Sequence, residues 1–208
     1  SPAKVQSALL EVMPERQVTL VDTTFKLDPP FFVMATQNPV EQEGVYQLPE
    51  AQLDRFMLKL VVDYNTKEEE LEIARRISSG NLETIESVVT HEDLNEIKQA
   101  IKDVHVDEEV ESYMIELVNA TRNPSEYGLN EIKDYIQFGA SPRVSIDMFK
   151  AVKAMAFMRG KDFVTPVDVA FIAKELMRHR IVLTYEAEAE GITTDEIIQK
   201  VLETVAIP

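Results

Sequence analysis

The sequence predicts an α/β fold in which a mixed segment, residues 1–63, is followed by a mostly helical domain, residues 64–208. Residues 31–35 form a continuous apolar run, "FFVMA", between prolines, which is typical of a strand buried on both faces of a parallel sheet. After Tyr64, apolar residues recur mainly at helical spacing. Because 45% of the 208 residues are hydrophobic, the chain can bury a sizeable core.

The first segment is predicted to contain a helix, a hairpin and two strands. Ser1-Pro2 indicates a helix start, since serine caps helices and proline is tolerated at the first helical position. The β-prone runs "QVTLV" and "TFKL" predict a hairpin over residues 17–27. Residues 58–62, "LKLVV", are a second candidate for a sheet strand after residues 31–35. This segment therefore resembles part of a layered α/β sheet.

The second segment is predicted to be helical from local signals. Thr66 with Glu69 is a capping box, and it opens a helix that ends near Gly80. In the helix that starts at Ser141-Pro142 and ends at Gly160, the predicted inward residues include Ile146 and Val152. Other helices are expected over residues 94–101 and 110–121, from Thr165-Pro166 and from about Thr194. A short extended segment is expected at 132–138. The acidic run at 185–191, "YEAEAEG", is predicted to be a solvated loop that would attract a basic partner.

Composition and charge exclude several classes of function. A formal net charge of -16 opposes nonspecific binding to nucleic acid or to an anionic membrane, and no apolar run approaches the roughly 20 residues of a membrane span. The chain has no cysteine, which excludes disulfides and thiol nucleophiles and fits a cytoplasmic location. His91, His105 and His179 lack the spacing of metal ligands, so no metal site is predicted.

Two polar residues at the ends of the expected strands are the first candidates for a site. Asn38 follows the first strand, where α/β sheets gather their ligands, and its amide would bind a phosphate or a water beside one. The alternative is an amide that caps a turn. Arg55 precedes the second strand, and its guanidinium suits bidentate contact with phosphate oxygens. Its alternative is an exposed salt bridge with Asp54 or Glu50.

Five motifs in order resemble the MoxR family of AAA+ ATPases over essentially the whole chain. They are "SPAKVQSALLEVMPERQVTL", "ATQNPVEQEGVYQLPEAQLDRF", "GASPR", "KDFVTPVDV" and "LMRHRIVLTYEAEAEG". The resemblance implies a partial P-loop NTPase core followed by a helical lid. It implies that Asn38 is the sensor 1 residue, that Arg55 is the arginine finger of a neighbouring subunit's site, that Arg143 is sensor 2, and that the hairpin faces the interior of a ring.

The resemblance also implies cofactors and partners. ATP and Mg²⁺ are the expected cofactors of the complete subunit, and a hexameric ring is the expected assembly. The expected work is chaperone-like remodelling or activation of client proteins, together with partners that carry von Willebrand factor A domains. Arg143 has an alternative, because an arginine early in a helix also pairs with acidic neighbours. Whether Arg143 acts on its own subunit or on the next one is left open by the sequence.

The chain departs from the family in two motifs. Its six glycines never stand in the G-x-x-x-x-G-K-[ST] spacing that cradles phosphates, and no apolar strand ends in Asp-Glu for magnesium. We therefore expect this chain to be the C-terminal part of a longer subunit and to be unable to hydrolyse ATP alone. The competing hypothesis is a noncatalytic helical interaction module. A winged-helix DNA binder is disfavoured by the charge of -16.

Overall fold

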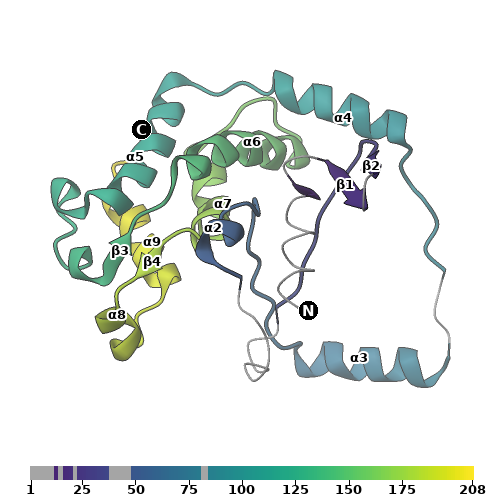
Figure 1. The fold of residues 1–208 in the computed structure, drawn as a ribbon, viewed down its shortest axis with the longest axis horizontal. Helices are drawn as coiled ribbons and strands as arrows, with labels where there is room; N and C mark the ends of the chain where they lie inside the picture. Colours follow the sequence, from purple (N-terminus) through teal and green to yellow (C-terminus); the bar gives the residue numbers. More distant parts are fainter. Residues whose placement is uncertain (1–11, 14–15, 21–22, 38–47, 81–83) are drawn as a thin grey trace.

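A computed structural model describes residues 12–13, 16–20, 23–37, 48–80 and 84–208 (Figure 1). Its strands are β1 (Gln17–Leu20), β2 (Thr23–Lys26), β3 (Ile136–Phe138) and β4 (Val182–Leu183). Its helices are α2 (Glu50–Leu53), α3 (Lys67–Ser78), α4 (His91–Asp103), α5 (Glu108–Arg122), α6 (Pro142–Met158), α7 (Pro166–Met177), α8 (Tyr185–Glu190) and α9 (Thr194–Thr204), with 3₁₀ turns at Pro124–Tyr127 and Lys133–Tyr135.

The main hydrophobic core lies within the last hundred residues, from Val104 to Val205. Helices α5, α6, α7 and α9 pack on one another, and each contributes a fully buried stripe. The members of these stripes with no exposed surface include Leu117, Met148, Leu176 and Ile198. Burying large aliphatic side chains is the main stabilising term of such a body, at about 1.5–3 kcal/mol per side chain. Among the described helices, none combines the length and hydropathy needed to cross a membrane.

Helix α3 has no buried residue, and Figure 1 shows it apart from the packed helices, at the end of a long connection from α4. It is held by local interactions, of which the predicted capping box of Thr66 and Glu69 is one. Helix α4 lies closer to the body, because Lys153 on α6 donates a hydrogen bond of 2.9 Å to the carbonyl oxygen of Lys102. Local signals therefore fix α3 where tertiary packing does not.

The two strands predicted at residues 31–35 and 58–62 are not formed among the described residues, and this prediction was wrong. The described sheets are two-stranded, β1 with β2 and β3 with β4, and neither includes those segments. Phe32 and Val62 are 78% and 90% exposed. A parallel strand needs hydrogen-bonded neighbours and helices on both faces, and the described part of the chain supplies neither to these two runs. Both segments have the apolar pattern of buried strands, but the described residues provide no paired strand and no covering helix for them.

Most of the remaining local predictions are confirmed. β1 and β2 form the antiparallel hairpin, with Gln17 opposite Lys26, whereas the expected N-terminal helix lies outside the described residues except for 12–13. The acidic run at 185–191 is not a loop but the short helix α8, because Thr184 caps its first turn and Gly191 ends it with φ of 75°. On α6, Val152 is buried as predicted, but Ile146 is 57% exposed.

The loop that leads into α6 is pressed against the end of α5. Thr121 is fully buried, and its Oγ1 accepts a hydrogen bond of 3.0 Å from the backbone N–H of Ala140. Arg122 donates from Nε to the carbonyl oxygen of Ala140 at 2.7 Å. A Cβ on Gly139 would lie 2.5 Å from the carbonyl oxygen of Thr121. Only glycine therefore allows the "GASPR" loop to approach α5 this closely.

Replacing Gly139 with alanine is expected to lower the free energy of unfolding by about 1–3 kcal/mol, as overpacking does at well-packed sites. The clash is with backbone atoms of α5, which cannot rotate away as a side chain would. Urea unfolding followed by circular dichroism measures the change. An unchanged midpoint would show that the loop has room that the structure does not give it.

Candidate functional site

Arg55 stands on a tight turn directly after α2. Pro49 precedes the helix, and the backbone N–H of Arg55 donates 3.2 Å to the carbonyl oxygen of Gln52. The Arg55 residue is exposed, and among the described residues its side chain makes no ion pair. The predicted alternative, a salt bridge to Asp54 or Glu50, is therefore not found among these residues. A charged, exposed guanidinium on a fixed turn is suited to reaching an external anion.

Asp54, the residue before Arg55, is the centre of a charged cluster. Its Oδ1 accepts 2.8 Å from the Ser141 hydroxyl, and its Oδ2 accepts 2.7 Å from Nη1 of Arg143. Ser141 occupies the N-cap of α6 without making a side-chain cap, because its hydroxyl is used for Asp54. Two of the three predicted site residues therefore lie near Asp54. Arg143 pairs with its carboxylate, and Arg55 is the next residue in the chain.

Arg143 is in the alternative arrangement that the sequence left open. Its side chain is 48% exposed and pairs with Asp54, so the guanidinium is held at one nitrogen and still faces solvent. A surface ion pair of this kind contributes little stability, about 0–1 kcal/mol. The contact does not test a role in nucleotide sensing. Asn38 lies outside the described residues, so its placement relative to these two arginines stays a prediction.

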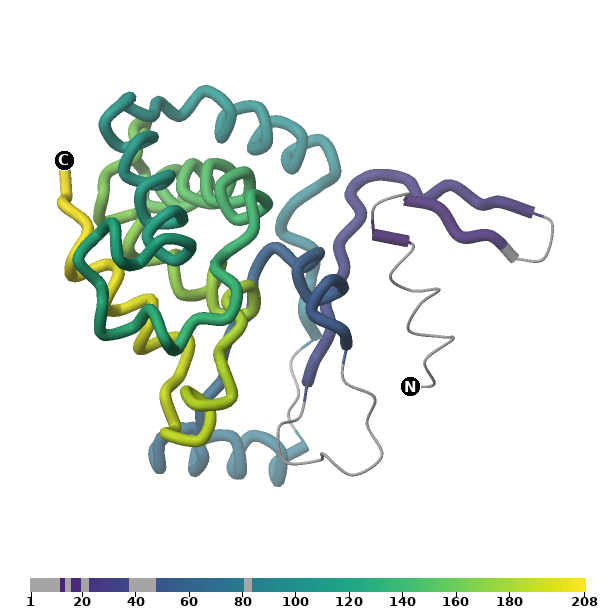
Figure 2. The backbone as a smooth tube through the Cα atoms, turned by 60° about the vertical axis from the view of Figure 1, so that its left-hand side comes forward, coloured from purple at the N-terminus to yellow at the C-terminus, as the bar shows by residue number. Residues whose placement is uncertain are grey.

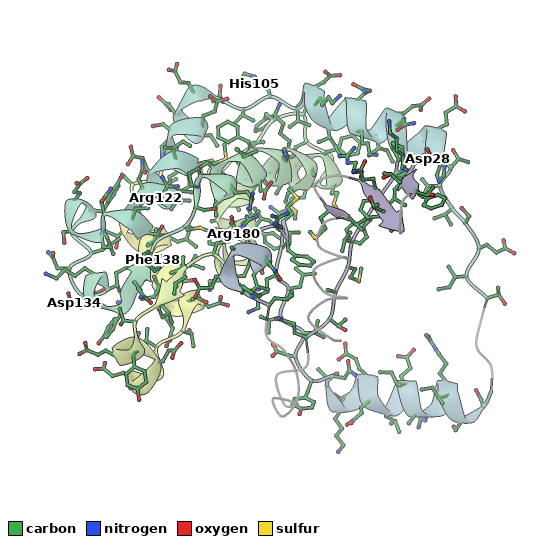
Figure 3. The ribbon with its side chains drawn as sticks, in the orientation of Figure 1. Asp28, His105, Arg122, Asp134, Phe138 and Arg180 are labelled. Carbon is green, nitrogen blue, oxygen red and sulfur yellow. The ribbon has the colours of Figure 1, made fainter. Side chains whose placement is uncertain are left out.

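The turn after α7, residues 178–180 with the sequence Arg-His-Arg, holds residues 54–59 against the helical body. Arg178 donates 2.7 Å to the carbonyl oxygen of Lys59, and the His179 ring lies 2.9 Å from the carbonyl oxygen of Phe56. Arg180 donates 3.0 Å to the carbonyl oxygen of Asp54. Figure 3 shows the labelled Arg180 beside α2, and Figure 2 shows the α2 segment between the helical body and the hairpin.

Carboxylates lie beneath this turn and pair with both of its arginines. Arg178 makes a two-pronged contact with Asp195 at 2.9 and 2.8 Å, and these hydrogen bonds raise the pKa of Arg178. Arg180 donates 2.6 Å to Oδ2 of Asp147, and its Nε lies 3.1 Å from Oδ1 of Asp54. Both guanidinium groups therefore lie beside carboxylates in a nearly closed environment.

His179 gives this turn a pH dependence. Burial lowers the pKa of His179, and the nearby Arg180 and Lys59 lower it further, against the hydrogen bond to Phe56 and the charge of Asp54. A carbonyl oxygen accepts, so Nε2 carries the proton and donates to Phe56, which leaves Nδ1 buried without a partner among the described residues. The neutral ring is the form that the folded chain holds.

The free energy of unfolding should fall as pH drops below about 6.5, the ordinary histidine value. The unfolded chain takes up a proton there and the folded chain does not, at a cost of at most about 1.4 kcal/mol for each pH unit. Urea unfolding between pH 5 and 7.5 measures the slope, and His179→Gln is the control, since glutamine donates a similar hydrogen bond but does not titrate. Equal slopes for both proteins would contradict the assignment.

The cluster can bind and orient anions, but these residues do not fit a complete nucleotide site. Arg55 and Arg143 suit phosphate oxygens. In the part of the chain that the structure describes, no group of three or more acidic or histidine side chains could hold a metal ion. The sequence also has no phosphate-cradling glycine loop. Among the described residues, these two guanidinium groups therefore supply positive charge but not the remaining parts of a nucleotide site.

Sequence reasoning missed three features of this cluster. They are the central place of Asp54, the half-buried Asp147 that pairs with Arg180, and the contacts of Arg178, His179 and Arg180 with residues 54–59. One signal was available for the turn. Three basic side chains stand together directly after the apolar helix 166–177 in a chain of net charge -16. Such residues are rarely buried unless they are paired or hydrogen-bonded.

Comparison with family models gives two matches. Residues 1–58 match the model described as ATPase family associated with various cellular activities (AAA). Residues 130–201 match the model described as AAA lid domain. The predicted fold class, a partial α/β core with a helical lid, is confirmed by these matches and by the structural neighbour below. The predicted division between residues 63 and 64 stays a prediction.

The chain is also similar over its full length to individual proteins. It is 45% identical to Chaperone MoxR1 of Mycobacterium tuberculosis, over 100% of this chain and 55% of that protein. It is 42% identical to the Bacillus subtilis protein YeaC, over 99% of this chain and 62% of that protein. A crystal structure from Cytophaga hutchinsonii, of a protein called a "putative ATPase", is 53% identical with a TM-score of 0.94, over 100% of this chain and 63% of that one. The chain thus spans only part of each relative.

Proposed function

Because this chain belongs to the MoxR-like AAA+ ATPases, we propose that it supplies the arginine-finger end of the core and the lid of an ATPase subunit. The full-length polypeptide that carries this chain then hydrolyses ATP with Mg²⁺ in a ring. The observation that carries the proposal is the exposed Arg55, whose turn is clamped to the helical body and whose neighbour Asp54 holds Arg143.

Arg55 acts on the nucleotide of the neighbouring subunit. Phosphoryl transfer asks little covalent chemistry of a protein, so positioning and neutralisation of charge on the phosphoryl oxygens account for the rate. An arginine supplied from another subunit contributes to both, and it makes turnover depend on assembly. Asn38 takes the sensor 1 role and positions the attacking water. Arg143 takes the sensor 2 role, and it exchanges Asp54 for a phosphate when the lid closes on nucleotide.

The ring drives chaperone-like remodelling or activation of client proteins. The proposed assembly is a hexamer, with von Willebrand factor A domain proteins among its partners, and the proposed location is the cytoplasm. Support comes from the name of one relative, Chaperone MoxR1, at 45% identity. This chain alone is proposed to be inactive, since it carries no phosphate loop in its sequence.

The experiment that tests this function compares the full-length polypeptide with residues 1–208 alone. Sedimentation velocity with and without ATP measures assembly, and phosphate release measures turnover. The proposal expects nucleotide-dependent rings and turnover from the full-length polypeptide and neither from the 208-residue chain. A full-length polypeptide that neither assembles nor hydrolyses ATP would instead identify a noncatalytic interaction module.

A further inference from the structure

One nitrogen of Arg180 holds both carbonyl groups that flank Arg55. Its Nη2 donates 3.0 Å to the carbonyl oxygen of Asp54 and 2.9 Å to that of Phe56. The backbone immediately before and immediately after Arg55 is therefore tied to a single atom. This contact fixes the backbone on both sides of Arg55.

The Arg180 side chain contacts several other parts of the chain that the structure describes. Its side chain has no exposed surface. Asp147 on α6 accepts 2.6 Å from Nη2, so the two N–H groups of this nitrogen are shared among three acceptors. The carbonyl oxygen of Leu176 accepts 3.3 Å from Nη1, and Nε lies 3.1 Å from Oδ1 of Asp54 without a hydrogen bond. Three separate elements, α6, α7 and the turn after α2, therefore meet at this one side chain.

Stability alone is a poor explanation of such a group. Buried ion pairs are often replaced by apolar residues without loss, since removing two charges from water offsets much of their attraction. Placing two carbonyl groups at defined positions is what a fixed polar group does and an apolar side chain does not. Within residues 54–59, the neighbouring Arg178 contacts Lys59 and His179 contacts Phe56, both on the C-terminal side of Arg55.

We propose that Arg180 is a positioning residue for Arg55, which fixes the turn between Asp54 and Phe56 so that the exposed guanidinium points at the neighbouring nucleotide. This inference rests on the proposed function, because it takes Arg55 as the group that meets phosphate. In this proposal the turn that carries Arg55 is attached to the lid helices α6 and α7 through Arg180 and moves with them.

The test measures ATP turnover in the full-length polypeptide with Arg180→Lys. A lysine keeps the charge, but its single ammonium cannot reach the acceptors of Nη2 and also replace the contacts of Nη1 with Leu176 and of Nε with Asp54. The expected result is a fall in kcat of about 100-fold, the effect of misplacing a catalytic group by an ångström, with KM for ATP and ring assembly unchanged. Adding Arg180→Lys to Arg55→Ala should cause no further loss, because the two residues act as a unit.

Arg178→Lys is the matched control, since Arg178 is a largely buried arginine of the same turn, 8% exposed, that contacts the backbone on only one side of Arg55. It should leave kcat near that of the unsubstituted protein. An equal fall in both lysine variants, or a further loss when Arg180→Lys is added to Arg55→Ala, would overturn the inference in favour of a general structural role.

Asp147→Asn decides the case in which Arg180→Lys does not fold. It removes the charge beneath Arg180 without changing the volume, and it should lower kcat at constant KM, whereas an unchanged kcat would overturn the inference. A large effect of Arg55→Ala with none of Arg180→Lys would reject the positioning role and keep the proposed function. No effect of Arg55→Ala would reject both.

Discussion

Replacing Arg55 with alanine in the full-length polypeptide is expected to reduce ATP turnover by about 1000-fold or more while ATP binding stays nearly unchanged, since arginines that act from a neighbouring subunit contribute about 10³–10⁵ in related NTPases. The side chain is exposed and makes no ion pair among the described residues, so its removal should leave the fold intact. Phosphate release measures turnover, and fluorescent-nucleotide titration measures affinity.

Arg76→Ala is the matched control for this prediction. Arg76 is an exposed arginine on α3 that pairs, among the described residues, only with Glu72 one helical turn away, at 3.3 Å. Its loss should change neither turnover nor affinity. A fall in ATP affinity as large as the fall in rate would contradict the finger assignment, because it would place Arg55 in ground-state binding.

Replacing Asp168 with alanine is expected to lower the free energy of unfolding by about 3 kcal/mol, the lower end of the cost of breaking a buried ion pair. The Asp168 carboxylate has no exposed surface and accepts 2.7 Å from Arg159, 3.1 Å from Lys161 and 2.6 Å from the Thr165 hydroxyl. Removing this carboxylate leaves Arg159 and Lys161 without their anionic partner, although each side chain is about one-third exposed and remains partly hydrated. Urea unfolding measures the change.

The contribution of the Asp168 carboxylate to the free energy of unfolding depends on pH. Burial would raise the pKa of Asp168, but the hydrogen bonds from Thr165, Lys161 and Arg159 outweigh it and lower the pKa to about 2. Its contribution is therefore complete above pH about 3.8 and is lost as pH falls towards 2. Glu69→Ala is the control, since Glu69 makes a capping box on exposed α3 and its loss should lower the free energy of unfolding much less. Similar losses in both variants would contradict a special role for burial.

The elements that the sequence predicts correctly are those fixed by neighbouring residues. The capping box of Thr66 and Glu69 and the proline start at Pro142 act within one helical turn, so α3 and α6 begin where they should. The runs at 31–35 and 58–62 failed as strands because pairing depends on distant segments. Ile146 failed because the 3.6-residue period gives a face and not its boundary, and this position is at the exposed edge of α6.

The site shows the same division. Residue type and motif order selected Arg55 and Arg143, and the structure pairs Arg143 with Asp54, the residue before Arg55. Arg180 was out of reach, because its partners Asp54 and Phe56 lie 126 and 124 residues away in the chain. No local pattern encodes such a contact. The tertiary fold turned a short basic run after α7 into the support of a turn near residue 55.

The most direct test of the central claim, that Arg55 completes a site on a neighbouring subunit, is ATP turnover per subunit measured across the assembly transition. The full-length polypeptide is diluted until sedimentation shows monomers, and turnover is recorded at each concentration. The account predicts near-zero turnover for monomers, a rise that follows the fraction of rings, and rings of Arg55→Ala that stay inactive. Equal turnover per subunit in monomers and rings would contradict it.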